Sequence, residues 1–267
     1  MSPYKNVYIF VLLTFLLSWP FMIYAFGFTD NLLSRYTFAS LGMMMVTVSA
    51  ILVRYYQEKK NFEDVCWNKG ELKWYLVILA FFLIYYMTPY LLEYFLGDLE
   101  MHELTFNRTI VLISSLSISY IAAFGEEFGW RGYLQKRLMD SELNHLNVLT
   151  IIGIIWGIWH FPIALGPFLR ELFMNNYSYE LLRNALISCA QMIGASIGLS
   201  YIFGSFYLKF KSIYLNSFLH FTYIGIRDAT FILFGATIFD VPIHFIPFVI
   251  VLAVTVRWLN TINKKDD

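Results

Sequence analysis

Long apolar stretches dominate the pattern of hydrophobic and polar positions along the chain. A helix that spans a bilayer needs about 20 predominantly apolar residues. Eight segments approach or exceed this length, at residues 7–28, 36–53, 74–96, 109–128, 148–168, 182–207, 212–234 and 241–259. Arg227 and Asp228 interrupt the seventh segment, and Pro242 and His244 open the eighth. The pattern predicts an all-α polytopic membrane bundle with about eight transmembrane helices.

The connections between these segments are short and contain neither a linker nor a low-complexity tract. We therefore expect a single integral-membrane domain over residues 1–267. The first apolar run is longer than a signal-peptide core, and no small-x-small cleavage site follows it, so we interpret it as an uncleaved span. Gly153 with Gly157, and Gly194 with Gly198, have the spacing that favours close helix packing.

The composition supports this class of protein and excludes others. Hydrophobic residues make up 58% of the chain and charged residues 14%, whereas soluble domains average about 45–50% and about 25%. The net charge is zero, so the chain lacks the basic excess of a nucleic-acid-binding protein. Its two cysteines, Cys66 and Cys189, form neither a disulfide framework nor a metal motif. We expect the lipid bilayer as a partner and no cofactor.

Lysine and arginine concentrate in the even-numbered connections between the apolar segments. The second connection carries Arg54, Lys59, Lys60, Lys69 and Lys73, the fourth Arg131, Lys136 and Arg137, and the sixth Lys209 and Lys211. Connections rich in Lys and Arg stay in the cytoplasm. The sequence therefore predicts a cell-membrane protein with both termini in the cytoplasm.

Two adjacent glutamates, Glu126 and Glu127, stand at the end of the fourth apolar run. One charge in the middle of a bilayer costs about 2.5–3.5 kcal/mol, and neighbouring like charges oppose each other. Glu127 and Arg131 are four residues apart, with the acid first, which favours an ion pair on one helix face. Glu126 points about 100° away from that face. We predict that Glu127 has a structural role and that Glu126 acts as a general base.

Two histidines, His160 and His220, also lie within apolar runs. Trp156 precedes His160 by four residues and Asn216 precedes His220 by four, so each pair shares a helix face. A glutamate base, one imidazole that shares the water and another that meets the developing oxyanion suffice for amide hydrolysis without a metal. These residues are the candidate catalytic set.

Three motifs now stand in order along the chain. They are Glu-Glu-x-x-x-Arg at residues 126–131, aromatic-x-x-x-His at residues 156–160, and a third-motif histidine at residue 220. This order resembles the CPBP intramembrane proteases, which group CAAX prenyl endopeptidases with the bacteriocin-processing and immunity proteins of the Abi type. The resemblance covers residues 126–220, and the first 108 residues match only as generic hydrophobic spans.

The resemblance implies roles for individual residues. In the family, the first glutamate and the second-motif histidine activate water, which assigns that role to Glu126 and His160. The third family motif is usually His-x-x-x-Asn, whose asparagine contacts the oxyanion. His220 matches the histidine, but Ile224 stands where the family has asparagine. Asn216 and Asp228 are the two residues that could take over the oxyanion contact of this asparagine.

The resemblance therefore implies a metal-independent endopeptidase that cleaves a peptide or a membrane-associated protein. Its substrate stays open among a prenylated tail, a bacteriocin leader and a quorum-sensing peptide. One alternative is a catalytically silent scaffold or bacteriocin-immunity protein, with a membrane sensor or transporter as its partner. Another is a zinc protease that uses Glu126, His160 and His220, because two histidines and one glutamate form a legitimate zinc set.

Overall fold

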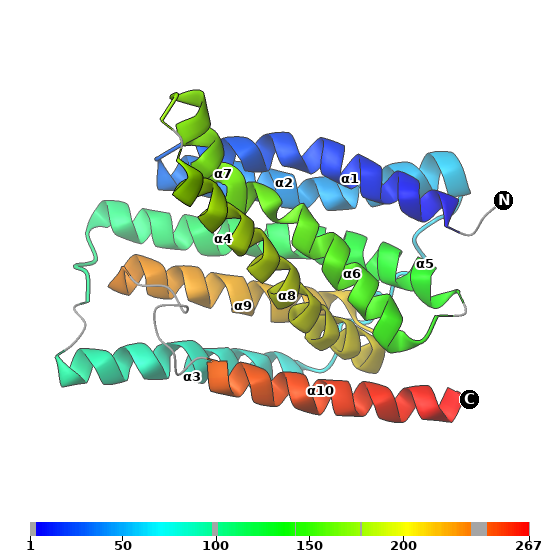
Figure 1. Ribbon diagram of the computed structural model, residues 1–267. Helices are drawn as coiled ribbons and strands as arrows, with labels where there is room; N and C mark the ends of the chain where they lie inside the picture. The colour runs from blue at the N-terminus through cyan, green and yellow to red at the C-terminus, as the bar shows by residue number, and fades with distance from the viewer. Residues whose placement is uncertain (1–3, 98–100, 142, 177, 236–244, 267) are drawn as a thin grey trace.

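The computed structural model describes residues 4–97, 101–141, 143–176, 178–235 and 245–266. Within these residues the secondary structure is helical, and the β pairing is limited to an isolated antiparallel bridge between Trp67 and Ser212. Figure 1 shows the helices as long rods packed side by side. The prediction of an all-α helical bundle is confirmed.

The rods follow one another with short connections. In chain order they are α1 (Lys5–Ile23) with η1 (Tyr24–Phe28), α2 (Leu32–Leu52) with η2 (Val53–Glu58), α3 (Leu72–Leu96), α4 (Phe106–Gly129) with η3 (Trp130–Gln135) and α5 (Lys136–Met139), α6 (His145–Trp159), α7 (Phe161–Phe173), α8 (Tyr179–Phe210), α9 (Ile213–Phe234) and α10 (Phe245–Asp266). The three η segments are single π-helical stretches that extend the preceding helices.

Six rods among the described residues are long and apolar enough to cross a membrane. They correspond to the first six apolar segments of the sequence. The seventh segment is α9, whose buried residues include the polar side chains of Asn216, Ser217, His220 and Thr222. Its mean hydropathy is lowered by these side chains. The eighth segment is represented by α10, and its opening residues, Pro242 and His244, lie outside the described part of the chain.

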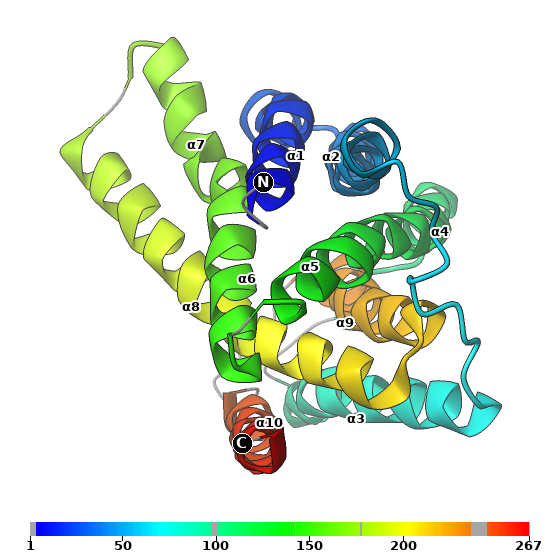
Figure 2. The same ribbon diagram turned by 90° about the vertical axis from the view of Figure 1, so that its right-hand side faces the viewer.

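The arrangement of the rods explains how distant motifs meet. Helix α4 packs between α2 and α9, and α6 packs along α8. Figures 1 and 2 show that the chain ends lie at the same end of the bundle, together with α5 and residues 59–71. A chain that crosses the membrane an even number of times has both ends on the same side. Helix α9 therefore carries the third motif directly against the first motif on α4.

One expectation about the fourth connection is wrong. Arg131, Lys136 and Arg137 were assigned to a connection after the fourth segment, but the helix continues through η3 and α5 to Met139. Arg131 is fully buried rather than exposed at an interface. The segment contains no helix breaker, and Glu127 compensates the buried charge of Arg131, so the chain has no need to turn toward water there.

The fifth segment, residues 148–168, is two helices rather than one. Helix α6 ends at Trp159 and α7 begins at Phe161, with Pro162 in its first turn. Proline lacks the N–H that would continue the ladder, and its ring clashes with the preceding turn. His160 lies at this junction and donates its backbone N–H to Trp156 and Gly157, at 3.2 Å each. Pro162 was the available sequence signal for this break.

A partly buried ion cluster contacts the helix extension that follows the glutamate pair. Arg137 contacts Glu58 at 2.5 Å and Asp64 at 3.1 Å. The Tyr133 hydroxyl donates to Glu58 at 2.9 Å, and Arg54 pairs with Asp64. Burial raises the pKa of the Asp64 carboxyl, but hydrogen bonds from Arg54 and Arg137 outweigh it and hold this pKa below its usual value. The cluster ties η2, the connection after it and α5 into one unit.

Candidate active site

The buried carboxylate of Glu127 gathers three groups from two different elements. Its Oε2 lies 3.1 Å from Nε of Arg131, and its Oε1 lies 2.8 Å from Nδ1 of His220. The side-chain amide of Asn216 donates a second contact to Oε2. All four residues are buried. The predicted ion pair between Glu127 and Arg131 is confirmed, whereas the contacts to His220 and Asn216 could be seen only in the packed structure.

Arg131 depends strongly on this carboxylate. Its guanidinium lies over the ring of Trp156 at 5.3 Å and the ring of Phe203 at 5.9 Å. The ion-pair contact is not aligned as a hydrogen bond, and none of the three guanidinium nitrogens has a hydrogen-bond partner among the described residues. A buried charge without compensation is strongly destabilising. Glu127 and the two aromatic rings therefore hold Arg131 in place.

Glu126 has different partners from Glu127. Its Oε2 accepts hydrogen bonds from the indole Nε1 of Trp130 at 3.2 Å and from that of Trp156 at 2.8 Å. In the described part of the chain no donor reaches Oε1. The side chain is 1% exposed. Thus Glu126 is hydrogen-bonded to two indoles rather than paired with Arg131, and both of these hydrogen bonds use Oε2.

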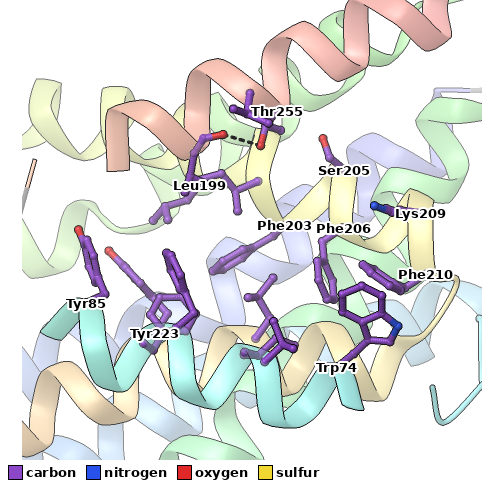
Figure 3. Close-up of a pocket in the computed structure, with 18 of the residues that line it drawn as sticks. Trp74, Tyr85, Leu199, Phe203, Ser205, Phe206, Lys209, Phe210, Tyr223 and Thr255 are labelled. Carbon is purple, nitrogen blue, oxygen red and sulfur yellow. Dashed lines mark hydrogen bonds between the residues drawn. The ribbon is translucent and has the colours of Figure 1, made fainter. Parts of the chain in front are cut away.

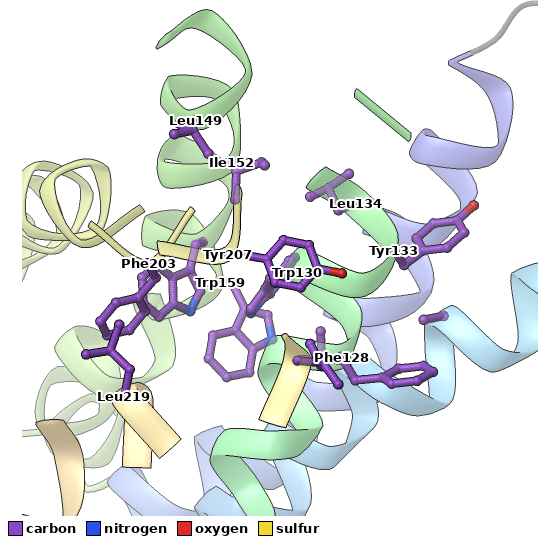
Figure 4. Close-up of a cluster of buried hydrophobic side chains, with 14 of the residues drawn as sticks. Phe128, Trp130, Tyr133, Leu134, Leu149, Ile152, Trp159, Phe203, Tyr207 and Leu219 are labelled. Carbon is purple, nitrogen blue, oxygen red and sulfur yellow. The ribbon is translucent and has the colours of Figure 1, made fainter. Parts of the chain in front are cut away.

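The tryptophan contacts to Glu126 were missed at the sequence level. Trp130 follows Glu126 by four residues, a spacing that places both side chains on one helix face. Its ring also packs edge-on against Trp159, with centroids 6.0 Å apart, in the apolar cluster of Figure 4. The same ring contacts Phe10 on α1 at 5.7 Å. These contacts fix the orientation of the carboxylate.

Hydrogen bonds define the tautomer of each histidine. Nδ1 of His160 lies 2.8 Å from the backbone oxygen of Trp156. A carbonyl oxygen only accepts, so Nδ1 carries the hydrogen and Nε2 holds the lone pair when the ring is neutral. Nδ1 of His220 donates to Glu127 in the same way, which leaves its Nε2 on the opposite side of the ring.

Trp156 brings the candidate residues together. Its ring centroid lies 5.4 Å from that of His160 and 5.7 Å from that of His220, while its indole N–H binds Glu126. Glu126 and His160 make no hydrogen bond to each other within the described residues. Each of them contacts the same indole instead, Glu126 through the N–H of Trp156 and His160 through its ring.

The third motif offers few alternatives for the missing asparagine. Ile224 is buried and apolar. Asp228 accepts two hydrogen bonds from Arg227, at 2.7 Å and 2.9 Å, and an ionised carboxylate cannot donate to an oxyanion. Asn216 gives one amide hydrogen to Glu127, which leaves it the second hydrogen as a donor. Of the two substitutes considered, Asn216 alone retains this capacity.

The zinc alternative lacks a ligand set in the structure. Among the described residues, no three or more His, Cys, Asp or Glu side chains are grouped so that they could hold a metal ion. Glu126, His160 and His220 face the Trp156 ring rather than one common point. Their arrangement fits an acid and imidazoles that act separately on a substrate.

An apolar cavity of about 470 Å³ adjoins the site between α3, α8, α9 and α10. Figure 3 shows Phe203 and Tyr223 on its walls, with Lys209 near Trp74 and Phe210. Phe203 also contacts His220, with ring centroids 5.1 Å apart. Phe203 therefore contacts both the cavity and His220.

Comparison with known proteins agrees with this geometry. Residues 108–226 match the family model described as Type II CAAX prenyl endopeptidase Rce1-like. CAAX prenyl protease 2 of Methanococcus maripaludis is 32% identical over 82 residues, which cover 30% of this chain and 27% of that relative. The chain thus matches about a quarter of the length of this curated relative. The resemblance inferred from the motifs is confirmed, because the segment that carries all three is similar to the Rce1-like CAAX prenyl endopeptidases of the CPBP family.

Proposed function

We propose that the chain is an intramembrane endopeptidase of the CPBP type, in which Glu126 activates the water that attacks a peptide bond. The orientation of the Glu126 carboxylate is the main support. Two indole donors occupy Oε2, and Oε1 is left to accept a proton. A positioned carboxylate that takes a proton in the transition state typically contributes 10²–10⁴-fold to the rate.

The remaining groups have complementary tasks. Nε2 of His160 accepts one hydrogen of the water and thereby directs the other toward Oε1 of Glu126. As that proton passes to Glu126, the water oxygen bonds to the carbonyl carbon of the substrate. The C–N bond then breaks, and Glu126 returns the proton to the departing amine nitrogen. Every atom and proton is accounted for within the substrate, the water and one carboxyl group.

The negative charge that develops on the carbonyl oxygen of the substrate needs a hydrogen-bond donor. We assign this role to His220. With Nδ1 bound to Glu127, a protonated His220 directs an N–H from Nε2 to the opposite side. Ile224 supplies no second donor, so the proposed enzyme is slow compared with a complete His-x-x-x-Asn site.

A membrane-associated peptide or protein fits this site as the substrate. The neighbouring 470 Å³ cavity is mostly apolar and suits a lipid-like tail or an apolar segment. A prenylated tail, a bacteriocin leader and a quorum-sensing peptide all belong to this class. We place the chain in the cell membrane with both termini in the cytoplasm, and the glutamate pair lies within the fourth span, which continues to Met139.

The proposal can be tested with purified protein in lipid nanodiscs. A quenched fluorescent peptide that carries S-farnesyl cysteine in a C-terminal CAAX sequence serves as the first probe. In cells, a Glu126→Gln chain should accumulate its natural peptide, which mass spectrometry can identify. We expect cleavage by the natural chain and loss of cleavage in Glu126→Gln, with equal folding. Cleavage by Glu126→Gln at the natural rate would contradict the proposal.

A catalytically silent scaffold or immunity protein is the second candidate, favoured specifically by Ile224 in the third motif. Such a protein would bind a membrane sensor or transporter and would not depend on Glu126. A cellular phenotype that survives Glu126→Gln, but not deletion of the chain, would support this candidate.

A further inference from the structure

The first two helices lie outside the segment that carries the motifs. The family match begins at residue 108, whereas α1 and α2 lie within residues 5–52. Even so, α2 packs along α4, and Figure 2 shows α1 between α2 and the pair formed by α6 and α7. The α1–α2 hairpin therefore contacts both elements that carry the residues proposed to activate water, Glu126 on α4 and His160 at the end of α6.

A side chain of α1 occupies a backbone oxygen at the break between α6 and α7. In a continuous helix the oxygen of Trp159 would accept the N–H of Ile163, four residues later. At the break, Ile163 donates to the oxygen of His160 instead, at 2.9 Å. The indole Nε1 of Trp19 donates to the oxygen of Trp159, at 3.1 Å. Because a buried carbonyl without a partner is costly, this indole stabilises the break at which His160 lies.

The same hydrogen bond acts on the peptide unit that leads into His160. The oxygen of Trp159 and the backbone N–H of His160 belong to one peptide unit, which is planar and rigid. Its oxygen binds Trp19 on α1, while its N–H binds the oxygens of Trp156 and Gly157 on α6. Both edges of the peptide plane are thus held, by two different helices. The direction in which the imidazole leaves the backbone depends on the orientation of this plane.

A side chain of α2 makes the equivalent contact beside the glutamate pair. The hydroxyl of Thr47 donates to the backbone oxygen of Gly125, at 2.5 Å. This oxygen belongs to the peptide unit that leads into Glu126. The two backbones approach closely here, because a Cβ at Gly129 would lie 2.8 Å from the backbone oxygen of Val46. Helix α2 therefore lies directly against the turn of α4 that carries the glutamates.

We propose that Trp19 and Thr47 are positioning residues, through which the α1–α2 hairpin fixes Glu126 and His160 relative to each other. This inference rests on the proposed function, in which these two residues activate the water. Each donor binds the oxygen of the peptide unit that precedes one of them. The packing of α1 on α2 joins the two donors. A misplacement of a reacting group by about 1 Å can cost about 10²-fold in rate, so the hairpin contributes to the geometry of the site without touching the substrate.

Removal of each donor without loss of side-chain shape tests this inference. Trp19→Phe keeps an aromatic ring and removes the indole N–H, and Thr47→Val keeps the branched shape and removes the hydroxyl. In nanodiscs, with the quenched farnesylated peptide, each change should lower kcat about tenfold or more through misplacement of a catalytic group. KM should stay unchanged, because neither side chain contacts the substrate in the proposal. Thr47→Ser restores a hydroxyl and should recover kcat.

Ser49 provides a matched control on the same helix. Its buried hydroxyl donates to the backbone oxygen of Met45 within α2, at 2.8 Å. Ser49→Ala therefore removes one hydroxyl–carbonyl hydrogen bond, as Thr47→Val does, but leaves the contact with α4 in place. This variant should keep the natural kcat even if its unfolding midpoint falls.

Nuclear magnetic resonance of ¹⁵N-labelled tryptophan and histidine tests the same inference without turnover. The two indole N–H groups bonded to Glu126 report on the orientation of its carboxylate. Their resonances should shift in Thr47→Val and stay in place in Ser49→Ala. The ring nitrogens of His160 report on its bond to the backbone, and their resonances should shift in Trp19→Phe.

The two measurements separate this inference from the proposed function. A natural kcat in Trp19→Phe or in Thr47→Val would overturn the inference. An equal loss of kcat in Ser49→Ala, or a loss in the other variants without any shift of the resonances, would also overturn it, because a general loss of stability would then be the cause. If the resonances shift as expected but the natural chain cleaves no peptide, the proposed function fails and the positioning role stays.

Discussion

Nδ1 of His220 lies 2.8 Å from Oε1 of Glu127, although 93 positions separate the two residues in the chain. The same carboxylate pairs with Arg131 on its own helix. Glu127, for which the sequence predicts only a local ion pair with Arg131, thus also orients the imidazole of His220 on α9. The two adjacent glutamates consequently differ in what their removal should do.

Replacement of each glutamate by glutamine should separate activity from stability. Glu126→Gln keeps the shape and an acceptor oxygen for Trp130 and Trp156, but removes the base, so cleavage should fall about 10²-fold or more. Glu127→Gln leaves Arg131 buried without an anion, which should cost about 3–5 kcal/mol of stability. Thermal unfolding and peptide cleavage, measured on both variants, check this assignment. If Glu126→Gln lowers stability and Glu127→Gln lowers only activity, the roles of the two glutamates are reversed.

The proposed chemistry needs no metal, which leads to a separate prediction. Purified protein should contain no stoichiometric zinc by elemental analysis, and chelators should leave cleavage unchanged. In the proposed mechanism, Glu126 and His160 hold the water instead. About one zinc per chain, lost in His160→Ala, would favour the zinc protease.

The altered third motif should limit the rate. Loss of one oxyanion donor typically costs about 10²–10³ in rate. Ile224 lies one turn beyond His220, so Ile224→Asn should supply the missing donor and raise kcat. Asn216→Ala should lower activity, and it should also remove a hydrogen bond to the Glu127 carboxylate. If Asn216 already fills the role, Ile224→Asn adds little while Asn216→Ala is severe.

Orientation in the membrane can be tested with a single cysteine. Lys60 is exposed in the connection after η2, which carries three lysines, Lys59, Lys60 and Lys69. In a chain without Cys66 and Cys189, Lys60→Cys should resist an impermeant thiol reagent in intact cells and react after permeabilisation. Labelling in intact cells would show that this connection faces outward.

Two glycines provide a matched test of helix packing. A Cβ at Gly153 would lie 2.5 Å from Cα of Ile197, whereas a Cβ at Gly194 would meet nothing within 4 Å. The expectation of close packing is therefore confirmed at Gly153 and wrong at Gly194. Gly153→Ala should destabilise by about 1–3 kcal/mol, while Gly194→Ala should be neutral or stabilise by about 0.5–1 kcal/mol. Equal unfolding midpoints for both variants would contradict this packing.

The amino-acid sequence alone determined the class of fold and the residues worth examining. Runs of about 20 apolar residues have few structures available to them other than membrane helices, because backbone groups in lipid must be paired internally. The order of the motifs marked Glu126, His160 and His220. Spacing by four residues predicted the ion pair between Glu127 and Arg131, because an i,i+4 contact depends only on the local helix.

Only the tertiary structure decided how these residues meet. The contact of Glu127 with His220 and Asn216 depends on the packing of α4 against α9, which no local spacing encodes. The extension of the fourth helix through Arg131 depends on burial of its charge among side chains from other helices. Long-range packing sets these contacts, since their free energy comes from groups far apart in the chain.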